Sequence, residues 1–168
     1  MTAEEVKKLL GLTPHPREGG WFVQTYAAGE NLDPSSFTDH RYASPRRTST
    51  AIYYLLEPDT FSEMHRLCSD EVFHFYAGEP VEMLQLYPDG SGRTVVIGID
   101  LVQGQRPQVL VERGVWQGSR LVAGGQWALL GCTVSPGFEY EDYDSAGHAE
   151  LSARWPTFDD LIRALTHG

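Results

Sequence analysis

Apolar and polar residues alternate in short runs over most of the chain, and glycine, proline and aspartate separate one run from the next. Alternation with a period of two is typical of strands that bury one face. The chain does not alternate strand and helix patterns as parallel sheets do. The pattern therefore predicts an all-β antiparallel sandwich or barrel of about eight to ten strands. The predicted strands are residues 21–26, 49–56, two within 61–78, 81–87, 93–101, 108–112 and 126–134.

Both ends of the chain carry helix signals instead. Thr2 can cap a first helix within residues 1–12, and Gly11 and Pro14 end it. Pro156 starts a short C-terminal helix over residues 156–167, where apolar residues recur at helical spacing. Residues 29–48 are polar and rich in turn residues, which predicts a long loop that is either a functional lid or disordered.

Composition limits the size and the partners of the molecule. A chain of 168 residues fits one domain, and its net charge of −10 argues against nucleic acid and anionic membranes as partners. Arg41, Arg46 and Arg47 form either a site for one phosphate group or an exposed basic loop. With two cysteines, no signal peptide and no long apolar run, we expect a cytoplasmic protein without a disulfide framework.

Residues 61–78, F-S-E-M-H-R-L-C-S-D-E-V-F-H-F-Y-A-G, hold the densest group of candidate functional side chains. His65 and Glu71 are separated by turn residues, which suits two neighbouring strands that each offer one side chain to a shared cavity. Strand alternation places Glu71, Phe73 and Phe75 on one face. His74 falls on the opposite face, so we expect it in sheet packing or at a dimer interface.

This segment, as His65-x-Leu67-x3-Glu71-x6-Gly78, resembles the first sequence motif of the cupins. The position of the second cupin motif is occupied by Glu112-x-Gly114-x2-Gln117-x3-Leu121. A closer resemblance is to the uncharacterised small cupins catalogued as domain of unknown function 985. It covers nearly the whole chain and rests on His15 to Phe22, Ser49 to Leu56, His65 to Gly78, Gly114-Val115-Trp116 and Pro136-Gly137-Phe138.

The resemblance implies one cupin domain over residues 1–168, with a jelly-roll barrel at residues 20–145 between the terminal helices. It also implies a homodimer and a place near the sugar-nucleotide epimerases and isomerases. It supplies no established activity for this group, so the function has to be inferred from the site.

The departures from the cupin pattern bear on metal binding. Cupins that bind metal hold it with three histidines and a glutamate, but here Leu67 and Gln117 occupy two of the histidine positions. If a metal is bound, its ligands are His65, Glu71 and Gln117, a weak set for a transition metal. We therefore expect no resident cofactor, and a divalent-metal enzyme remains the less favoured alternative.

Without a metal, His65 and Glu71 can form a proton-transfer pair in which the carboxylate orients the imidazole. The resemblance to the epimerases implies isomerase or epimerase chemistry with His65 as base and a tyrosine as acid. Tyr53, Tyr76, Tyr140 and Tyr143 are the candidates, and the sequence does not choose among them. A ligand-binding or sensing protein without catalysis is the equally weighted alternative.

The expected ligand is a small polar molecule such as a nucleotide, a sugar nucleotide or a related metabolite. The residues expected to contact it, besides the His65–Glu71 pair, are Phe73, Phe75, Trp116, Gln117 and Phe138. His15 is expected to be structural, and Asp70 to cap a turn. The Gly19-Gly20 pair either cradles a phosphate or forms a tight turn.

Overall fold

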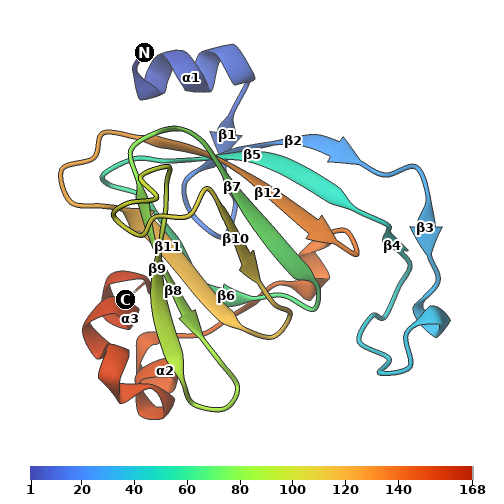
Figure 1. Ribbon diagram of the computed structural model, residues 1–168. Helices are drawn as coiled ribbons and strands as arrows, with labels where there is room; N and C mark the ends of the chain where they lie inside the picture. The colour runs from blue at the N-terminus through green and yellow to red at the C-terminus, as the bar shows by residue number, and fades with distance from the viewer. Residues whose placement is uncertain (168) are drawn as a thin grey trace.

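The computed structural model describes residues 1–167 and shows two facing antiparallel sheets with helices at both ends of the chain (Figure 1). The helices are α1 (Ala3–Leu10), α2 (His148–Arg154) and α3 (Asp159–Ala164), and the short 3₁₀ turns are η1 (Pro34–Ser36), η2 (Tyr140–Asp142) and η3 (Pro156–Phe158). The fold is the expected all-β jelly roll with short terminal helices.

Within residues 1–167 the strands form a six-stranded, a five-stranded and a two-stranded sheet. The first has the order β1 (Thr13–Pro14), β2 (Trp21–Ala27), β5 (Thr50–Leu56), β12 (Ala128–Ser135), β7 (Asp70–Gly78) and β10 (Gln108–Val111). The second has the order β13 (Asp144–Ser145), β6 (Phe61–Arg66), β11 (Trp116–Leu121), β8 (Val81–Leu86) and β9 (Gly92–Ile97). The third pairs β3 (Asn31–Leu32) with β4 (Arg46–Arg47).

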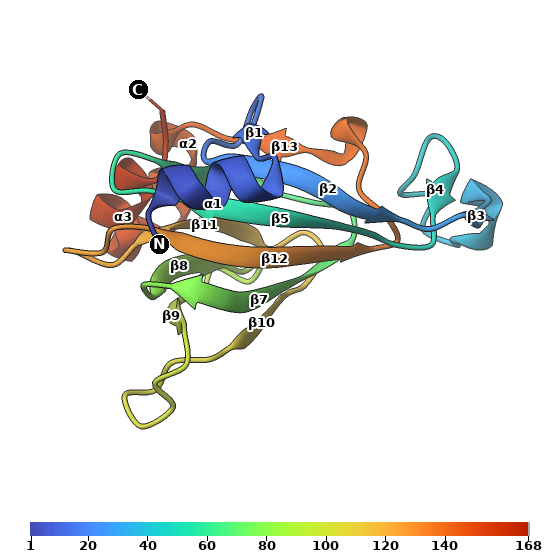
Figure 2. The same ribbon diagram turned by 90° about the horizontal axis from the view of Figure 1, so that it is seen from above.

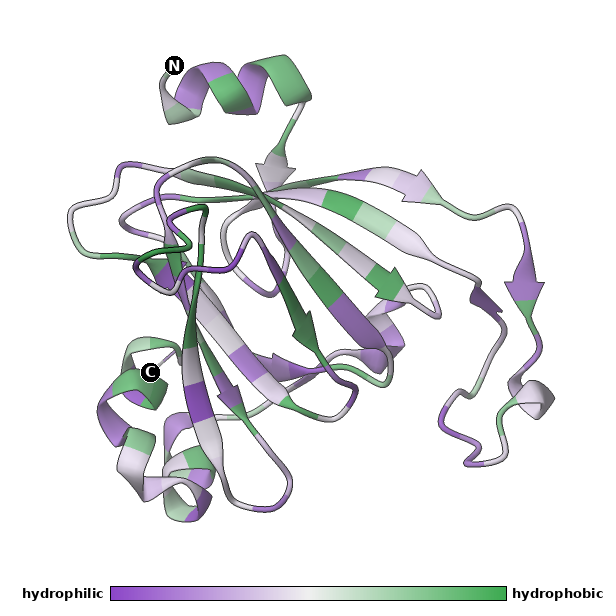
Figure 3. Cartoon of the chain, in the orientation of Figure 1, coloured by the Kyte–Doolittle hydropathy of each residue, from purple (hydrophilic) through white to green (hydrophobic). Residues whose placement is uncertain are grey.

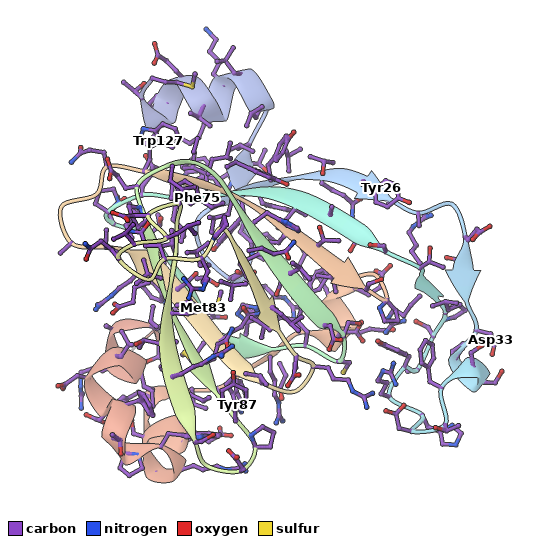
Figure 4. All side chains as sticks on the ribbon, in the orientation of Figure 1. Tyr26, Asp33, Phe75, Met83, Tyr87 and Trp127 are labelled. Atoms are coloured by element: carbon purple, nitrogen blue, oxygen red, sulfur yellow. The ribbon has the colours of Figure 1, made fainter. Side chains whose placement is uncertain are left out.

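Three apolar clusters hold these layers together. The largest fills the space between the two main sheets and includes Tyr54, Phe73 and Met83. A second cluster packs α2 and α3 against the five-stranded sheet around Trp116. A third seats α1 across the outer face of β5 and β12, next to Trp127 (Figures 2 and 4). The terminal helices therefore cover sheet faces that water would otherwise reach.

The first helix follows the signals in the sequence. Thr2 and Glu5 form a reciprocal capping box, and Gly11 ends the helix in the left-handed conformation with φ of 67°. Lys7 is buried beneath the helix, where its ammonium contacts Glu57 at 3.0 Å and lies 4.1 Å from the centre of the Trp21 ring. The prediction of a capped helix ending at Gly11 is confirmed.

Strand β11 is missing from the sequence prediction, although it lies at the centre of the five-stranded sheet. Its side chains are buried on both faces, and those facing the barrel interior include polar Gln117 and Ser119. Gly118 lets β6 approach closely, because a β-carbon there would meet the sulfur of Met64 at 2.7 Å. A strand of this composition has no apolar–polar alternation to reveal it.

Two other boundaries differ from the prediction for local reasons. Strand β9 ends at Ile97 rather than at Leu101, because the chain turns at residues 99–104 and exposes its apolar side chains. A single helix was expected over residues 156–167. The structure instead has the 3₁₀ turn η3 followed by the helix α3. Helix α2, which no side chain caps, was not predicted.

Residues 29–48 form an arm that reaches beyond the main sheets (Figure 1). Strands β3 and β4 pair at its base, and β4 is hydrophilic throughout (Figure 3). Asp33 lies on this arm, far from the centre of the barrel (Figure 4), and its carboxylate accepts a hydrogen bond from the amide of Ser35 at 2.8 Å. The segment is therefore an arm that holds two short paired strands and one 3₁₀ turn.

A tight loop of residues 15–20, called here the His15 loop, precedes β2. The His15 amide donates to the Gly20 carbonyl at 2.9 Å, and Gly19 and Gly20 have positive φ values of 97° and 67°. The Tyr54 hydroxyl donates to the Gly19 carbonyl at 2.8 Å, and the Glu63 amide donates to the Glu18 carbonyl at 2.9 Å. These bonds tie the loop to both main sheets.

Gly19→Ala should destabilise the protein by roughly 2–4 kcal/mol, because the new β-carbon would clash with the Phe61 carbonyl oxygen at a backbone conformation that alanine disfavours. Urea denaturation measures the change in the free energy of unfolding. Gly29→Ala is the matched control, since open space surrounds that position, and it should change stability by less than about 0.5 kcal/mol. Equal stability of the two variants would show that the loop relaxes freely.

Candidate functional site

A cavity of about 340 Å³ lies at the end of the barrel where β6 and β12 finish and β5 and β7 begin. Its polar lining residues are His15, Glu18, Gln24, Arg47, Thr50, His65, Glu71, Glu139, Tyr140 and Tyr143. Its apolar lining residues are Phe22, Ile52, Leu67, Cys132, Val134 and Phe138. The two main sheets, the His15 loop and residues 138–143 all contribute, so the site depends on the whole fold.

His65 is the last inward-facing residue of β6, and its residue surface is only 2% exposed. Its Nδ1 lies 2.7 Å from the backbone carbonyl oxygen of Glu63. A carbonyl oxygen can only accept, so Nδ1 carries the proton and, in the neutral ring, Nε2 carries the lone pair. Tyr143 stacks on the imidazole with ring centres 4.9 Å apart. The ring is therefore held in the tautomer whose Nε2 carries the lone pair.

Glu71 begins the buried part of β7 and bridges the two sheets. Gln117, the cross-strand neighbour of His65 on β11, donates its amide Nε2–H to Glu71 Oε2 at 2.5 Å. Burial and the charge of Glu18 raise the pKa of Glu71 to about 7, against the opposing effects of His65 and Gln117. Among the described residues Glu71 makes no hydrogen bond with His65. The expectation that Glu71 orients the imidazole is therefore wrong, because the Glu63 carbonyl does so.

Two functional candidates were missed by sequence reasoning. His15 and Glu18 both line the cavity, and the Glu18 carboxylate accepts a hydrogen bond from the Ser62 hydroxyl at 2.5 Å. The signal was the run H-P-R-E-G-G, whose glycines permit the tight turn that carries the two side chains inward. A β-carbon at Gly19 would meet the carbonyl oxygen of Phe61, and one at Gly20 that of Leu55, so this tight turn requires glycine at both positions.

The predicted aromatic walls lie mostly elsewhere. Phe138 lines the cavity as expected. Phe73 is buried in the core between the sheets, and Phe75 packs against that core (Figure 4). Trp116 belongs to the cluster beneath α2 and α3, on the opposite face of β11 from Gln117. Strand alternation predicted which residues point inward, but the barrel interior is filled at the level of Phe73 and opens only nearer its end.

The structure separates the four candidate tyrosines. Tyr53 and Tyr76 contact each other on the outer face of the six-stranded sheet, with ring centres 5.9 Å apart. Tyr140 and Tyr143 line the cavity. The Tyr143 hydroxyl donates to Glu63 Oε1 at 2.7 Å, and burial raises its pKa. Tyr143 is therefore engaged with the protein, whereas the Tyr140 hydroxyl makes no hydrogen bond within residues 1–167.

The remaining candidates are structural. His74 lies on the outer face, where its Nε2 is 3.4 Å from the Thr133 hydroxyl. Asp70 accepts a hydrogen bond from the Arg113 amide at 2.8 Å and so caps a turn.

The donor set does not suit the metal site of typical cupins. Within the described chain, no three His, Cys, Asp or Glu side chains converge in a way that could hold a metal ion. Leu67 occupies the cavity wall with an apolar side chain, and the amide nitrogen of Gln117 is committed to Glu71. His65 and Glu71 alone are a poor set for a transition metal.

A buried ion pair positions the segment that carries Tyr140 and Tyr143. Arg46 on β4 has a side chain only 1% exposed and binds both carboxylate oxygens of Asp142, at 2.8 and 2.7 Å. It also donates to Glu141. Three arginines were candidates for phosphate binding. Arg46 is buried in this ion pair, and Arg41 pairs with Asp39. Of the three, only Arg47 lines the cavity.

Arg46→Met should destabilise the protein by about 3–5 kcal/mol, because it leaves Asp142 buried without its partner. The double variant Arg46→Met/Asp142→Leu should recover part of this loss, since it removes the unpaired charge as well. Chemical denaturation measures both. Arg163→Met is the matched control, because the Arg163 side chain is 65% exposed and pairs with Asp159 at the surface. This substitution should change stability by less than about 1 kcal/mol.

Glu71→Gln should remove a pH dependence of stability. The folded-state pKa of about 7 lies above the ordinary value of 4.5, so the contribution of Glu71 to stability is fully present below pH 4.5 and is lost as the pH rises through 7. The variant should therefore gain about 1–3 kcal/mol over wild type at pH 8 and little at pH 4. Urea denaturation at both pH values, with Glu112→Gln as an exposed control, checks this. The same difference at both pH values would contradict it.

Fold and cavity together define a jelly-roll barrel with a cavity at one end, where polar groups of His65, Glu71 and the His15 loop lie among apolar side chains. The chain belongs to the cupin superfamily: residues 4–146 match the family described as Cupin superfamily (DUF985). A curated relative, the uncharacterised protein YML079W of Saccharomyces cerevisiae, is 29% identical over 135 residues, which cover 76% of this chain and 67% of the relative.

Two solved structures resemble the whole chain. A hypothetical protein from Leishmania major is 30% identical with a TM-score of 0.90, and the match covers all of both chains. Protein SO0799 from Shewanella oneidensis is 32% identical with a TM-score of 0.87, covering 99% of this chain and 98% of that one. The prediction of a small cupin of this family is confirmed.

A more distant likeness shows the fold alone. The oxalate decarboxylase of Lactobacillus farciminis, solved as a formate complex, is 13% identical with a TM-score of 0.52, and the match covers 92% of this chain and 41% of that protein. Across residues 1–167 there is no helix with both the length and the apolar character needed to cross a membrane.

Proposed function

We propose that the cavity binds a small polar metabolite and that His65 acts there as the base of a metal-free isomerisation or epimerisation. The observation that carries this proposal is the bond between His65 Nδ1 and the Glu63 carbonyl, which leaves Nε2 as the ring nitrogen able to take a proton. A buried histidine fixed by its backbone in this way is pre-organised for proton transfer.

Size and charge narrow the ligand class. A volume of about 340 Å³ is near the lower end of small-molecule sites, so the cavity suits a sugar-sized group rather than a whole sugar nucleotide. The carboxylates of Glu18 and Glu139 make the lining acidic and disfavour a buried phosphate. Exposed Arg47 offers the nearest cationic contact, so a phosphate of a nucleotide-linked ligand would lie toward this side chain.

Binding without turnover is the second candidate function. It is favoured by the hydrogen bond from the Tyr143 hydroxyl to the Glu63 carboxylate. Because of this bond the hydroxyl is not free to give a proton back to a substrate. A ligand-binding or sensing protein needs the shaped cavity but no proton donor across from His65.

A thermal-shift screen with sugars, sugar phosphates, nucleotides and sugar nucleotides tests the proposal. A compound at 100 times its dissociation constant stabilises the folded protein by about 2.7 kcal/mol, which raises the melting temperature measurably. His65→Ala and Glu71→Gln should abolish that shift, because both residues line the cavity. His74→Gln, on the outer face of β7, should keep it. A shift that survives both cavity substitutions would place the ligand elsewhere and refute this site.

A further inference from the structure

The His15 loop holds its histidine through the backbone. His15 Nδ1 accepts a hydrogen bond from the Glu18 amide at 2.8 Å, and the Arg17 amide lies 3.4 Å away. A backbone amide can only donate, so Nδ1 carries the lone pair. In the neutral ring the proton therefore resides on Nε2, which is the opposite tautomer to that of His65.

The surroundings keep His15 neutral and immobile. Its side chain is only 4% exposed, and its ring packs edge-on to Phe22 with ring centres 4.7 Å apart. Burial lowers the pKa of His15, with a further lowering from His65 that Glu18 and Glu63 oppose. Its Nε2 lies 3.8 Å from Glu18 Oε2, which is too far for a hydrogen bond. The Nε2–H group is thus available to another acceptor.

The cavity consequently presents two imidazoles with complementary functions. Both line it, one from the His15 loop and one from the end of β6. Nδ1 of His65 donates to a backbone carbonyl, so its Nε2 offers a lone pair. Nδ1 of His15 accepts from a backbone amide, so its Nε2 offers a proton. A ligand that satisfies both needs an acceptor next to a removable proton. A carbonyl group with a hydrogen on the neighbouring carbon has this arrangement.

We infer that His15 is a second catalytic residue, whose Nε2–H hydrogen-bonds the carbonyl oxygen of a substrate while His65 removes the proton from the adjacent carbon. The inference rests on the proposed function of His65 and extends it to a substrate class, small enolisable carbonyl compounds. Neutral imidazoles with lowered pKa are effective electrophiles of this kind.

The step balances within the substrate and the two histidines. The α C–H bond breaks, its proton moves to His65 Nε2, and its electron pair forms the carbon–carbon double bond of an enolate. The negative charge that develops on oxygen is stabilised by the His15 N–H bond. In an α-hydroxy carbonyl compound, the hydroxyl proton then moves to the former carbonyl oxygen and His65 returns its proton to the former carbonyl carbon, which completes an isomerisation. Protonation of the first carbon from its other face by water, while His65 releases its proton to water, completes an epimerisation. Neither route needs an oxidant or a reductant.

The test follows α-proton exchange in deuterium oxide by proton NMR, with the full chain and a panel of dihydroxyacetone, glyceraldehyde, free ketoses, free aldoses and pyruvate. The wild-type protein should exchange the α-proton of at least one of these compounds. His15→Asn should lower that rate about 100-fold or more, because asparagine supplies an oxygen in place of Nδ1 but no donor in place of Nε2. His15→Gln, which carries an amide donor near the Nε2 position, should restore part of the rate.

His65→Gln separates this inference from the proposed function. Loss of exchange in His65→Gln with a full rate in folded His15→Asn would overturn the inference and leave the role of His65 standing. Full rates in both variants would overturn both. No exchange of any compound in the panel would overturn the carbonyl substrate class, while the ligand screen would still decide whether the cavity binds.

A measurement on the protein alone checks the tautomers. Nitrogen-15 NMR of histidine-labelled protein should show the Nε2–H form for His15 and the Nδ1–H form for His65. An Nδ1–H form at His15 would overturn the inference, because Nε2 would then have no proton to donate.

Discussion

The hydrogen bond from Gln117 to Glu71 joins the two main sheets at the level where the apolar core ends and the cavity begins. Polar groups buried between sheets need partners, since leaving one unpaired costs about 1–3 kcal/mol. This bond satisfies a carboxyl group that burial and Glu18 already make hard to ionise. It also commits Gln117 to a structural role at the position where other cupins place a metal ligand. One contact thereby closes the core and shapes the chemistry of the cavity.

The His15 loop is the second point at which stability and chemistry coincide. It is bonded to Tyr54 on β5 and to Glu63 on β6, so it bridges the same two sheets from the open end. Glu63 contributes three times, since its amide holds the loop, its carbonyl orients His65 and its carboxylate binds Tyr143. The two histidines are therefore held by one continuous set of backbone bonds. Such pre-organisation is what proton transfer requires.

Much of the fold could be predicted from the sequence because its signals are local. The capping box of α1, the apolar run of β5, the alternation along β7 and the turn residues between strands each act within a few residues. Strand β11 escaped prediction, since distant elements bury both of its faces: α2 and α3 cover one, and the opposite sheet covers the other. His65, Glu71 and Phe138 were found at the cavity, but Phe73 and Trp116 were not. The alternation of side chains along a strand shows which residues face the barrel interior. It does not show where along the barrel this interior is packed and where it opens into a cavity.

The sequence by itself determined the class of fold and the pairing of His65 with Glu71 on inward faces, since periodicity and turn chemistry are written residue by residue. Only the tertiary structure decided what those side chains do. The orienting partner of His65 is a backbone carbonyl, and the neighbour that completes the cavity is His15, fifty residues earlier in the chain. Which nitrogen of each imidazole donates and which accepts depends on the backbone groups that the packing of the two sheets places beside it. A local sequence pattern does not contain this information. The sequence around His65 thus predicts the fold, whereas the packing of the two sheets brings the residues of the site together.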